Sequence, residues 1–334
     1  MDEINFDDLH SVRNQQRQLV DQKRRKARPL VALLPILMKT VRLLGLERAL
    51  FRRYFTPIKQ RIDAQAEQSF SNYQPGSGDV VVCSYFKSGT HWAMQVAHQI
   101  INLGEAEFDC IYDVIPWNEA PPSGAGLSLQ DPRPLQLSKT GQRVIKTHAC
   151  AELVPYTESA KYLCVIRDPK DVFVSSYHFM RAVMLGPLMP SVPTWLGLYL
   201  SDQAFWRPWA DFTASYWGWR DRPNVLFLTY EQMQENPEAM VIKIAEFLGV
   251  ELDAAQLQKV LQLSSYDYMR NNDHKFHFSV GSPLTPPHGK MIRQGKKGKS
   301  AELISAAQQI QIDDFCRQKL VDLGSDFPYT EHFG

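Results

Sequence analysis

A loop after the first β-branched run carries residue types suited to binding an anion. Residues 79–85 (DVVVCSY) have the pattern of a buried strand, residues 86–92 (FKSGTHW) form the loop, and a stretch with helical apolar spacing follows. A strand, a tight loop and a helix can cradle a phosphate, because loop N–H groups and the positive helix end point at the anion. Four loop residues offer such a ligand a cation, a hydroxyl or close backbone approach: Lys87, Ser88, Gly89 and Thr90.

The same loop has two other interpretations. It also fits a plain strand–helix turn with a surface lysine. A nucleotide-dependent kinase has the pattern GxxxxGK[ST], in which the lysine follows the second glycine, and Asp168 at a later strand end would then bind magnesium. Here Lys87 precedes the single Gly89, so the kinase pattern is not met.

Three further short apolar runs end in polar residues. Residues 143–146, 162–166 and 225–229 have strand patterns, and each leads into residues that can contact a ligand: Thr147-His148, Arg167-Asp168 and Tyr230-Glu231. Helical patterns follow the last two, from Asp171 to about Arg181 and through Phe247. Strands that alternate with helices imply a parallel sheet, which binds ligands at its carboxyl edge. The sequence therefore predicts an α/β fold, a single P-loop-like domain with a central parallel sheet flanked by helices.

Composition narrows the classes of function. The formal net charge of the 334-residue chain is +1, so it lacks the overall basic field of nucleic-acid-binding proteins, and any anion site is local. Five cysteines, odd in number and without CxxC spacing, argue against a disulfide framework and a metal site, and they fit a reducing compartment. We interpret them as small core residues and expect a cytoplasmic protein.

The first 75 residues predict a charge-rich, helical N-terminal extension. A turn cluster, QPGSG at residues 74–78, separates it from the α/β domain at 76–334. Within it, residues 29–46 are strongly apolar, but the run before Lys39 is about half of what a bilayer crossing needs. Two interpretations stay open: a helix packed on the domain, and an interfacial helix that makes weak membrane-surface contact through residues 29–53.

Five motifs in order resemble cytosolic sulfotransferases that use 3′-phosphoadenosine 5′-phosphosulfate (PAPS). The loop at 86–92 with Tyr85 is similar to the family's phosphosulfate-binding loop, YPKSGTTW. The other matches, over residues 78–330 together, are KTH at 146–148, RDPKDVFVSSYHF at 167–179, YEQM…NP…FLG at 230–249, and RQG at 293–295 with Gly298. The resemblance implies an enzyme that moves a sulfuryl group from PAPS, as co-substrate and without metal, to a hydroxyl or amine of a small molecule.

The resemblance also implies a role for each matched residue. His148 is the general base for in-line attack by the acceptor, and Lys146 and Lys87 stabilise developing charge. Arg167, Ser175 and Arg293 hold the 3′-phosphate, which distinguishes PAPS from ATP. The remaining cofactor-binding residues are Ser88, Gly89, Thr90, His91, Trp92, Tyr230, Ser264, Tyr266, Gln294 and Gly295, of which Trp92 and Tyr266 stack on adenine.

The chain departs from the family pattern at several positions. Phe86 stands where the family has proline, His91 where it has threonine and Gln294 where it has lysine, and the tryptophan after Gly298 is missing. These changes put cofactor affinity and its pH dependence in question. The family's C-terminal dimerisation motif is not recognisable, so a monomer and a homodimer both remain open, and the N-terminal extension has no counterpart in the usual cytosolic members.

The acceptor is the least determined part of the prediction. Residues 181–219 are rich in aromatic, methionine and proline residues, which indicates an apolar acceptor pocket or lid, or alternatively a helical core region. We expect a hydrophobic phenol, alcohol, steroid or natural-product intermediate. The alternatives to sulfuryl transfer are a P-loop-type kinase and a non-catalytic nucleotide-binding module, and the second would be marked by loss of Lys87 or His148, which are both present.

Overall fold

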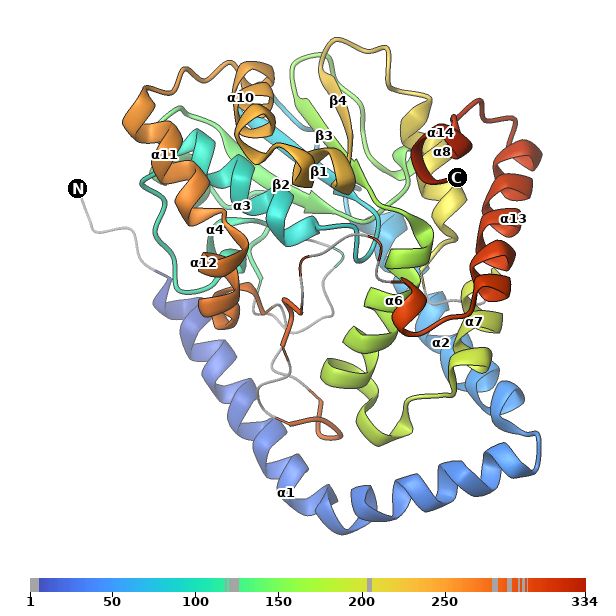
Figure 1. Cartoon of the computed structure of the whole chain (residues 1–334). Coiled ribbons are helices and arrows are strands. Elements are labelled where there is room, and N and C mark those ends of the chain that lie inside the picture. The colour runs from blue at the N-terminus through green and yellow to red at the C-terminus, as the bar shows by residue number, and fades with distance from the viewer. Residues whose placement is uncertain are drawn as a thin grey trace.

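Four short apolar strands form a parallel sheet at the centre of the computed structural model (Figure 1). The structure describes residues 6–117, 119, 126–202, 206–277, 282–286, 290–293, 295, 298 and 300–334. The strands are β1 (Asp79–Ser84), β2 (Arg143–Thr147), β3 (Lys161–Ile166) and β4 (Val225–Thr229), in the order β2-β1-β3-β4. Their carboxyl ends share one edge of the sheet, as the sequence predicts, so the predicted α/β fold is confirmed.

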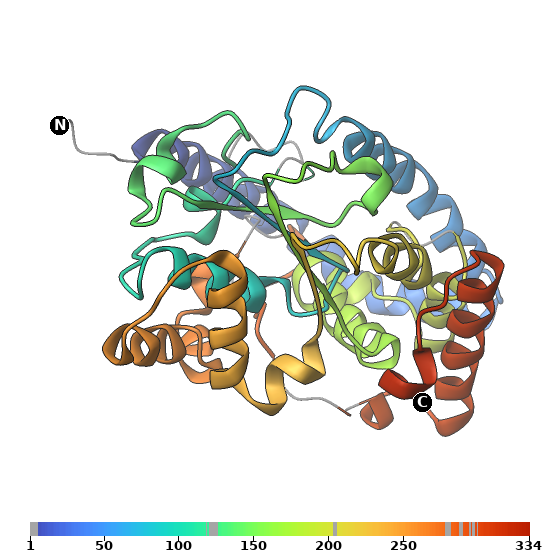
Figure 2. The ribbon, with the colours of Figure 1, turned by 90° about the horizontal axis from the view of Figure 1, so that it is seen from above.

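Helices cover both faces of the sheet because the strands alternate their apolar side chains between two cores. Val80 and Val82 of β1 face a core that includes α3 (Thr90–Ile101) and α10 (Pro237–Leu248), whereas Val81 and Cys83 face the core of α6 (Pro169–Phe179) and α8 (Trp209–Trp217). Figure 2 shows this layering from above, with the orange α10 and the red C-terminal helices on opposite sides. All five cysteines are buried and unpaired, which confirms them as core residues.

The remaining elements connect or extend these layers. They are α1 (Asp7–Leu43), α2 (Glu47–Gln68), α4 (Ile111–Val114), α5 (Arg133–Leu137), η1 (Ala151–Leu153), η2 (Met180–Leu185), η3 (Gly186–Leu188), α7 (Val192–Tyr199), α9 (Tyr230–Glu235), α11 (Ala254–Leu263), α12 (Tyr266–Asn271), η4 (Asp273–Phe276), η5 (Ser300–Glu302), α13 (Ala306–Asp322) and α14 (Tyr329–Phe333).

Two predicted helices differ from the structure at their ends. The helix expected through Phe247 is divided into α9 and α10, because Asn236 leaves the helical conformation and caps α10, where its side chain accepts from the Ala239 N–H and Pro237 starts the new helix. The helix expected from Asp171 to about Arg181 begins at Pro169, ends as α6 at Phe179 and continues as the π-helical η2.

The N-terminal helices pack against the α/β core. Met38 of α1 and Phe51 and Phe55 of α2 belong to the same buried cluster as Val81 of the sheet. Buried Glu47 accepts hydrogen bonds from the Ser191 N–H, at 3.0 Å, and from nearby hydroxyls. The N-terminal helices and the α/β domain therefore share one hydrophobic core. The domain boundary near residue 75 stays a prediction. No single described helix is long and apolar enough to span a bilayer; α1 and α2 reach that level only as a pair bent by 115°.

Candidate functional site

The loop between β1 and α3 has a constrained backbone. Lys87 has φ 63° and Gly89 has φ 90°, and Lys87 is one of two non-glycine residues with positive φ in the described part of the chain. A side chain at position 89 would put its Cβ 2.6 Å from the ring of Tyr230, so only glycine fits this close approach. The surrounding fold therefore holds a conformation that a free lysine-containing turn would rarely adopt.

The hydroxyls of this loop differ in their surroundings. Thr90 accepts a hydrogen bond from Ser84 at 2.7 Å. Ser88 is fully buried, and its Oγ has no hydrogen-bond partner among the described residues. A buried hydroxyl without a partner is unfavourable by about 1–3 kcal/mol. Ser88 is not among the residues that line the neighbouring cavity, although Lys87, Gly89 and Thr90 of the same loop are.

His148, directly after β2, is oriented by the end of β1. Its Nδ1 lies 2.6 Å from the backbone carbonyl of Ser84, and because a carbonyl only accepts, Nδ1 carries the proton. Nε2 is then the unprotonated nitrogen of the neutral ring. Burial and the charges of Lys146 and Lys87 lower the pKa of His148 to about 3, so the ring is neutral at physiological pH.

Lys146, at the end of β2, is held by two aromatic residues. Its Nζ donates to the Tyr112 hydroxyl at 3.0 Å and lies 3.2 Å from the centre of the Trp117 ring. The Tyr112 hydroxyl also forms a hydrogen bond with Nε2 of His91, at 2.9 Å. Burial lowers the pKa values of Lys146 and His91 well below their ordinary values, with repulsion between neighbouring cations as a further cause.

Glu119 supports the same strand end. It accepts a hydrogen bond from the His148 backbone N–H at 2.7 Å, another from the Thr147 hydroxyl, and one from Trp117 at 3.4 Å. Burial raises the pKa of its carboxyl group. No sequence pattern predicts Tyr112, Trp117 and Glu119 as site residues, because they precede β2 without any recognisable spacing and reach the site only through the fold.

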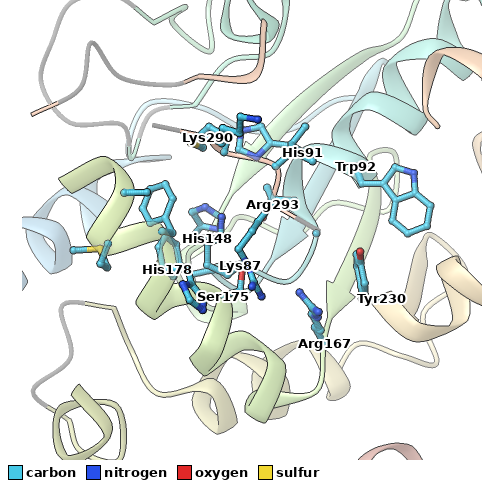
Figure 3. A pocket seen from close by; sticks show the side chains of 18 of the residues that line it. Lys87, His91, Trp92, His148, Arg167, Ser175, His178, Tyr230, Lys290 and Arg293 are labelled. Atoms are coloured by element: carbon cyan, nitrogen blue, oxygen red, sulfur yellow. The ribbon is translucent and has the colours of Figure 1, made fainter. Parts of the chain in front are cut away.

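Several basic side chains line one cavity, among them Lys87, Lys146, Arg167 and Arg293. Figure 3 shows Lys87, Arg167 and Arg293 near one another. Burial and the positive charge of Arg167 lower the pKa of Lys87 to about 8. Arg167 donates to Asp171 at 3.0 Å and lies 4.4 Å from the centre of the Tyr230 ring, while Arg293 pairs with Glu302. Such a concentration of buried and partly buried cations favours an anionic ligand.

Aromatic rings lie beside this cationic end. The rings of Trp92 and Tyr230 are 5.5 Å apart, edge to face, and the Tyr266 hydroxyl donates to the carbonyl of Arg293 at 3.0 Å. Gly295 has φ 59°, and a Cβ there would come within 2.3 Å of the Tyr266 ring, so glycine is required for this contact. The arrangement leaves flat aromatic surfaces at the edge of the cavity.

The other predicted residues are placed as follows. Ser175, on α6, lines the cavity. Ser264 also lines it, but its hydroxyl donates to the Val260 carbonyl of its own helix at 2.6 Å. Gln294 lies outside the described residues, and the described residues hold no group of three or more histidine, cysteine, aspartate or glutamate side chains that could bind a metal ion.

The cavity has a volume of about 1390 Å³ and a second, apolar end. Phe86, in the position of the family's proline, packs its ring 4.0 Å from Trp206 and 5.5 Å from Phe179, centre to centre. Residues 181–219 were expected to form either an apolar acceptor pocket or a helical core region, and each interpretation holds for a different part of this segment. Arg181, Met184, Leu185 and Trp206 are among the lining residues, whereas α7 and α8 bury Trp195 and Trp209 in the core.

Comparison with known proteins identifies the family. The family model described as "Sulfotransferase domain" matches residues 77–324. This chain belongs to the sulfotransferase family. It is 27% identical to human Sulfotransferase 1C2 over 270 residues, which cover 77% of this chain and 88% of that protein. It is 31% identical to mouse Sulfotransferase 1 family member D1 over 260 residues, covering 75% and 86%.

Solved structures show the same fold. Mouse sulfotransferase SULT7A1 complexed with PAP has a TM-score of 0.59 at 24% identity, covering 78% of this chain and 90% of that one. Retinol dehydratase in complex with androsterone and inactive cofactor PAP has a TM-score of 0.63 at 20% identity, covering 81% and 88%. The family model begins at residue 77, so α1 and α2 lie outside the match, although Gln16, Tyr54, Phe55 and Ile58 of these helices line the cavity of this sulfotransferase.

Proposed function

We propose that this sulfotransferase moves a sulfuryl group from PAPS to a hydroxyl or amine of a small hydrophobic molecule, with His148 as the general base. The observation that carries the proposal is the orientation of His148. The Ser84 carbonyl at 2.6 Å holds the proton on Nδ1, which leaves the Nε2 lone pair for the acceptor, beside Lys146 and Lys87.

The residues of the cationic end fit PAPS as the co-substrate. The 5′ side is assigned to the loop residues Ser88, Gly89, Thr90 and His91, of which the last three line the cavity. The 3′-phosphate is assigned to Arg167, Ser175 and Arg293, because a planar guanidinium group suits that anion. Adenine is assigned to the aromatic edge with Trp92, Tyr230, Ser264 and Tyr266, and Gln294 and Gly295 are assigned with Arg293 to the 3′-phosphate side. When bound, PAPS supplies the sulfuryl group on an activated phosphosulfate linkage.

The protein's own groups then perform the proton and charge chemistry. Nε2 of His148 accepts the proton of the acceptor hydroxyl or amine as the new bond to sulfur forms. Lys146 and Lys87 stabilise negative charge on the transferred and leaving oxygens. The two lysines lower the pKa of His148 in the free protein, and an anion beside them offsets that effect, which makes His148 a stronger base when co-substrate is present.

The apolar end of the cavity suits a hydrophobic acceptor. Its lining includes Phe86, Phe179, Met180 and Trp206, and α2 adds Ile58 from outside the family match. A guinea pig relative, 24% identical over 257 residues, is named 3-beta-hydroxysteroid sulfotransferase, which supports an alcohol of that size and polarity. The cytoplasmic location and the choice between monomer and homodimer stay predictions.

Calorimetric titration tests the co-substrate. We would titrate the full chain with 3′-phosphoadenosine 5′-phosphate (PAP), ATP and adenosine 5′-phosphosulfate, and repeat the PAP titration on Arg167→Ala. Charge-assisted hydrogen bonds contribute about 1.5–3 kcal/mol each, so we expect roughly a 10- to 100-fold loss of PAP affinity in the variant. The surface variant Arg220→Ala, whose partner Asp326 is exposed, is the control.

Each outcome has a clear meaning. Binding that requires the 3′-phosphate and weakens with Arg167→Ala supports PAPS as the co-substrate. Preference for ATP with magnesium would favour the kinase alternative instead, and binding of none of the three nucleotides would contradict both assignments.

A further inference from the structure

The two N-terminal helices expose an unusual amount of apolar side chain. Among the described residues, ten of the sixteen exposed large apolar side chains lie between Leu19 and Tyr54. Those near the bend between α1 and α2 form what we call the helical corner: Leu30, Leu33, Ile36, Leu37, Leu43, Leu44, Leu46, Leu50 and Tyr54. Leu43 is 78% exposed and Ile36 is 66% exposed, which is atypical of a surface that faces only water.

The apolar stripe of α1 is wider than its buried part. Leu34 and Met38 are buried, whereas Leu30, Leu33 and Leu37, which are their neighbours at three- and four-residue spacing or adjoin them on the helix, are exposed. A helix on a globular protein normally turns a single apolar face to the core. Here the apolar stripe of α1 extends beyond the core contact, and Figure 1 shows the bend between the blue α1 and α2 at the edge of the molecule, away from the sheet.

The charge of this region is strongly basic. Residues 22–54 contain ten lysine or arginine residues and one acid, in a chain whose formal net charge is only +1. The acid, Glu47, is buried and accepts hydrogen bonds from Ser191 and Thr194. Exposed Lys39, Arg42, Arg52 and Arg53 lie among the leucines along the chain.

Charge also discriminates between partners for this surface. A second copy of the chain would bring two strongly basic surfaces together, and such like-charge contacts are unfavourable. An anionic lipid surface complements both properties, because leucine side chains enter the acyl boundary while lysine and arginine side chains remain at the level of the headgroups. Each basic residue near such a surface contributes about 1 kcal/mol.

We infer that the helical corner docks this protein on an anionic lipid surface, lying in the interface without crossing it. The bend of 115° between α1 and α2 brings apolar residues from both helices, and from the turn between them, into one projecting region. The docking rests on exposure and charge alone, independently of the reaction that the cavity performs.

The helical corner continues along α2 to residues that line the cavity, so docking would also affect access of the acceptor. This consequence rests on the proposed function. Leu46, Leu50, Tyr54 and Ile58 are spaced four residues apart along α2, and the last two line the cavity. Each is a neighbour of the next on the helix. A docked molecule would therefore hold its acceptor cavity beside the lipid, where a hydrophobic alcohol or phenol concentrates.

Vesicle sedimentation of the full chain tests the docking. We expect cosedimentation with phosphatidylcholine vesicles that contain phosphatidylglycerol, weaker binding to pure phosphatidylcholine, and weaker binding at high salt. The triple variant Ile36→Glu, Leu43→Glu, Leu44→Glu should lose about tenfold or more in partition, because each change removes an inserting side chain. The matched control is Ile310→Glu, Val321→Glu on α13, where the side chains are 56% and 69% exposed, and it should bind as the wild type does.

Two further measurements separate the possible failures. PAP titration of the triple variant should match the wild type, so loss of vesicle binding with intact nucleotide binding reports on the helical corner and not on folding. Failure of the wild type to bind the anionic vesicles, or an equal loss in the α13 control, would overturn the inference. A wild-type dimer that the triple variant converts to monomer, without vesicle binding, would instead assign the surface to a second copy.

Discussion

The two ends of the cavity are built in different ways. At the cationic end, Lys146 is the second-last residue of β2, and His148 and Arg167 directly follow β2 and β3. Hydrogen bonds to backbone or neighbouring side chains hold all three in place. At the apolar end, Phe86 and Ile58 come from a loop and an N-terminal helix and are held by packing. Proton transfer and charge stabilisation need atoms fixed within a fraction of an ångström, whereas binding of an apolar acceptor needs mainly shape and exclusion of water.

Replacement of the proposed base is the strongest test of this difference. We expect His148→Ala to lower turnover by about two to four orders of magnitude, because the change removes the proton-accepting Nε2, while PAP still binds. The measurement is steady-state sulfation of a phenol such as 2-naphthol, with PAP titration alongside. His332→Ala, in the C-terminal helix α14, is the control, and turnover of His148→Ala near the wild-type value would remove His148 from the mechanism.

The affinity for PAP, measured as a function of pH, tests the role of Lys87 at the cationic end. Lys87, with its pKa lowered to about 8, is protonated below that pH, and an anion binds the protonated form more tightly. PAP affinity should therefore be constant below pH 8 and fall above it, by up to about tenfold per pH unit. Calorimetry of Lys87→Met should show weaker binding, by about tenfold or more, without this fall. A wild-type affinity that does not change through pH 8 to 9 would contradict the assignment.

The apolar end predicts a smaller and separate effect. Ile58→Ala removes half-buried apolar surface from the cavity, and at about 0.8 kcal/mol per CH₂ fully buried, a partial loss gives roughly a 3- to 10-fold rise in KM for 2-naphthol. PAP affinity should not change, because the Ile58 side chain carries no charge and no hydrogen-bonding group for the nucleotide. Ile310→Ala on the outer face of α13 is the matched control. An unchanged KM, or a parallel loss of PAP affinity, would show that the two ends are not separable in this way.

Sequence patterns predicted the part of the site that is local in the chain. The four strands, the loop at 86–92 and the residues at the strand ends were all recognisable, because a buried parallel strand is a short apolar run and its ligand-binding residues come next along the chain. The break between α9 and α10 was missed, since Asn236-Pro237 was read as part of a motif and not as a helix cap and start.

Other parts of the site depended on contacts that no local pattern encodes. Tyr112 and Glu119 precede β2 by many residues and reach Lys146 and His148 only because the connection between α3 and β2 folds back over the strand end. Ile58 lines the cavity because Phe51 and Phe55, on the same helix, are buried in the core of the α/β domain.

The sequence by itself determined the parallel α/β fold, the anion-binding loop and the identity of the residues at the strand ends, because periodicity and adjacency are properties of the chain. Only the tertiary structure decided which nitrogen of His148 carries the proton, how Lys146 is held, and which helices close the apolar end. These outcomes depend on distances between residues far apart in the sequence, and such distances are set by how whole elements pack on one another.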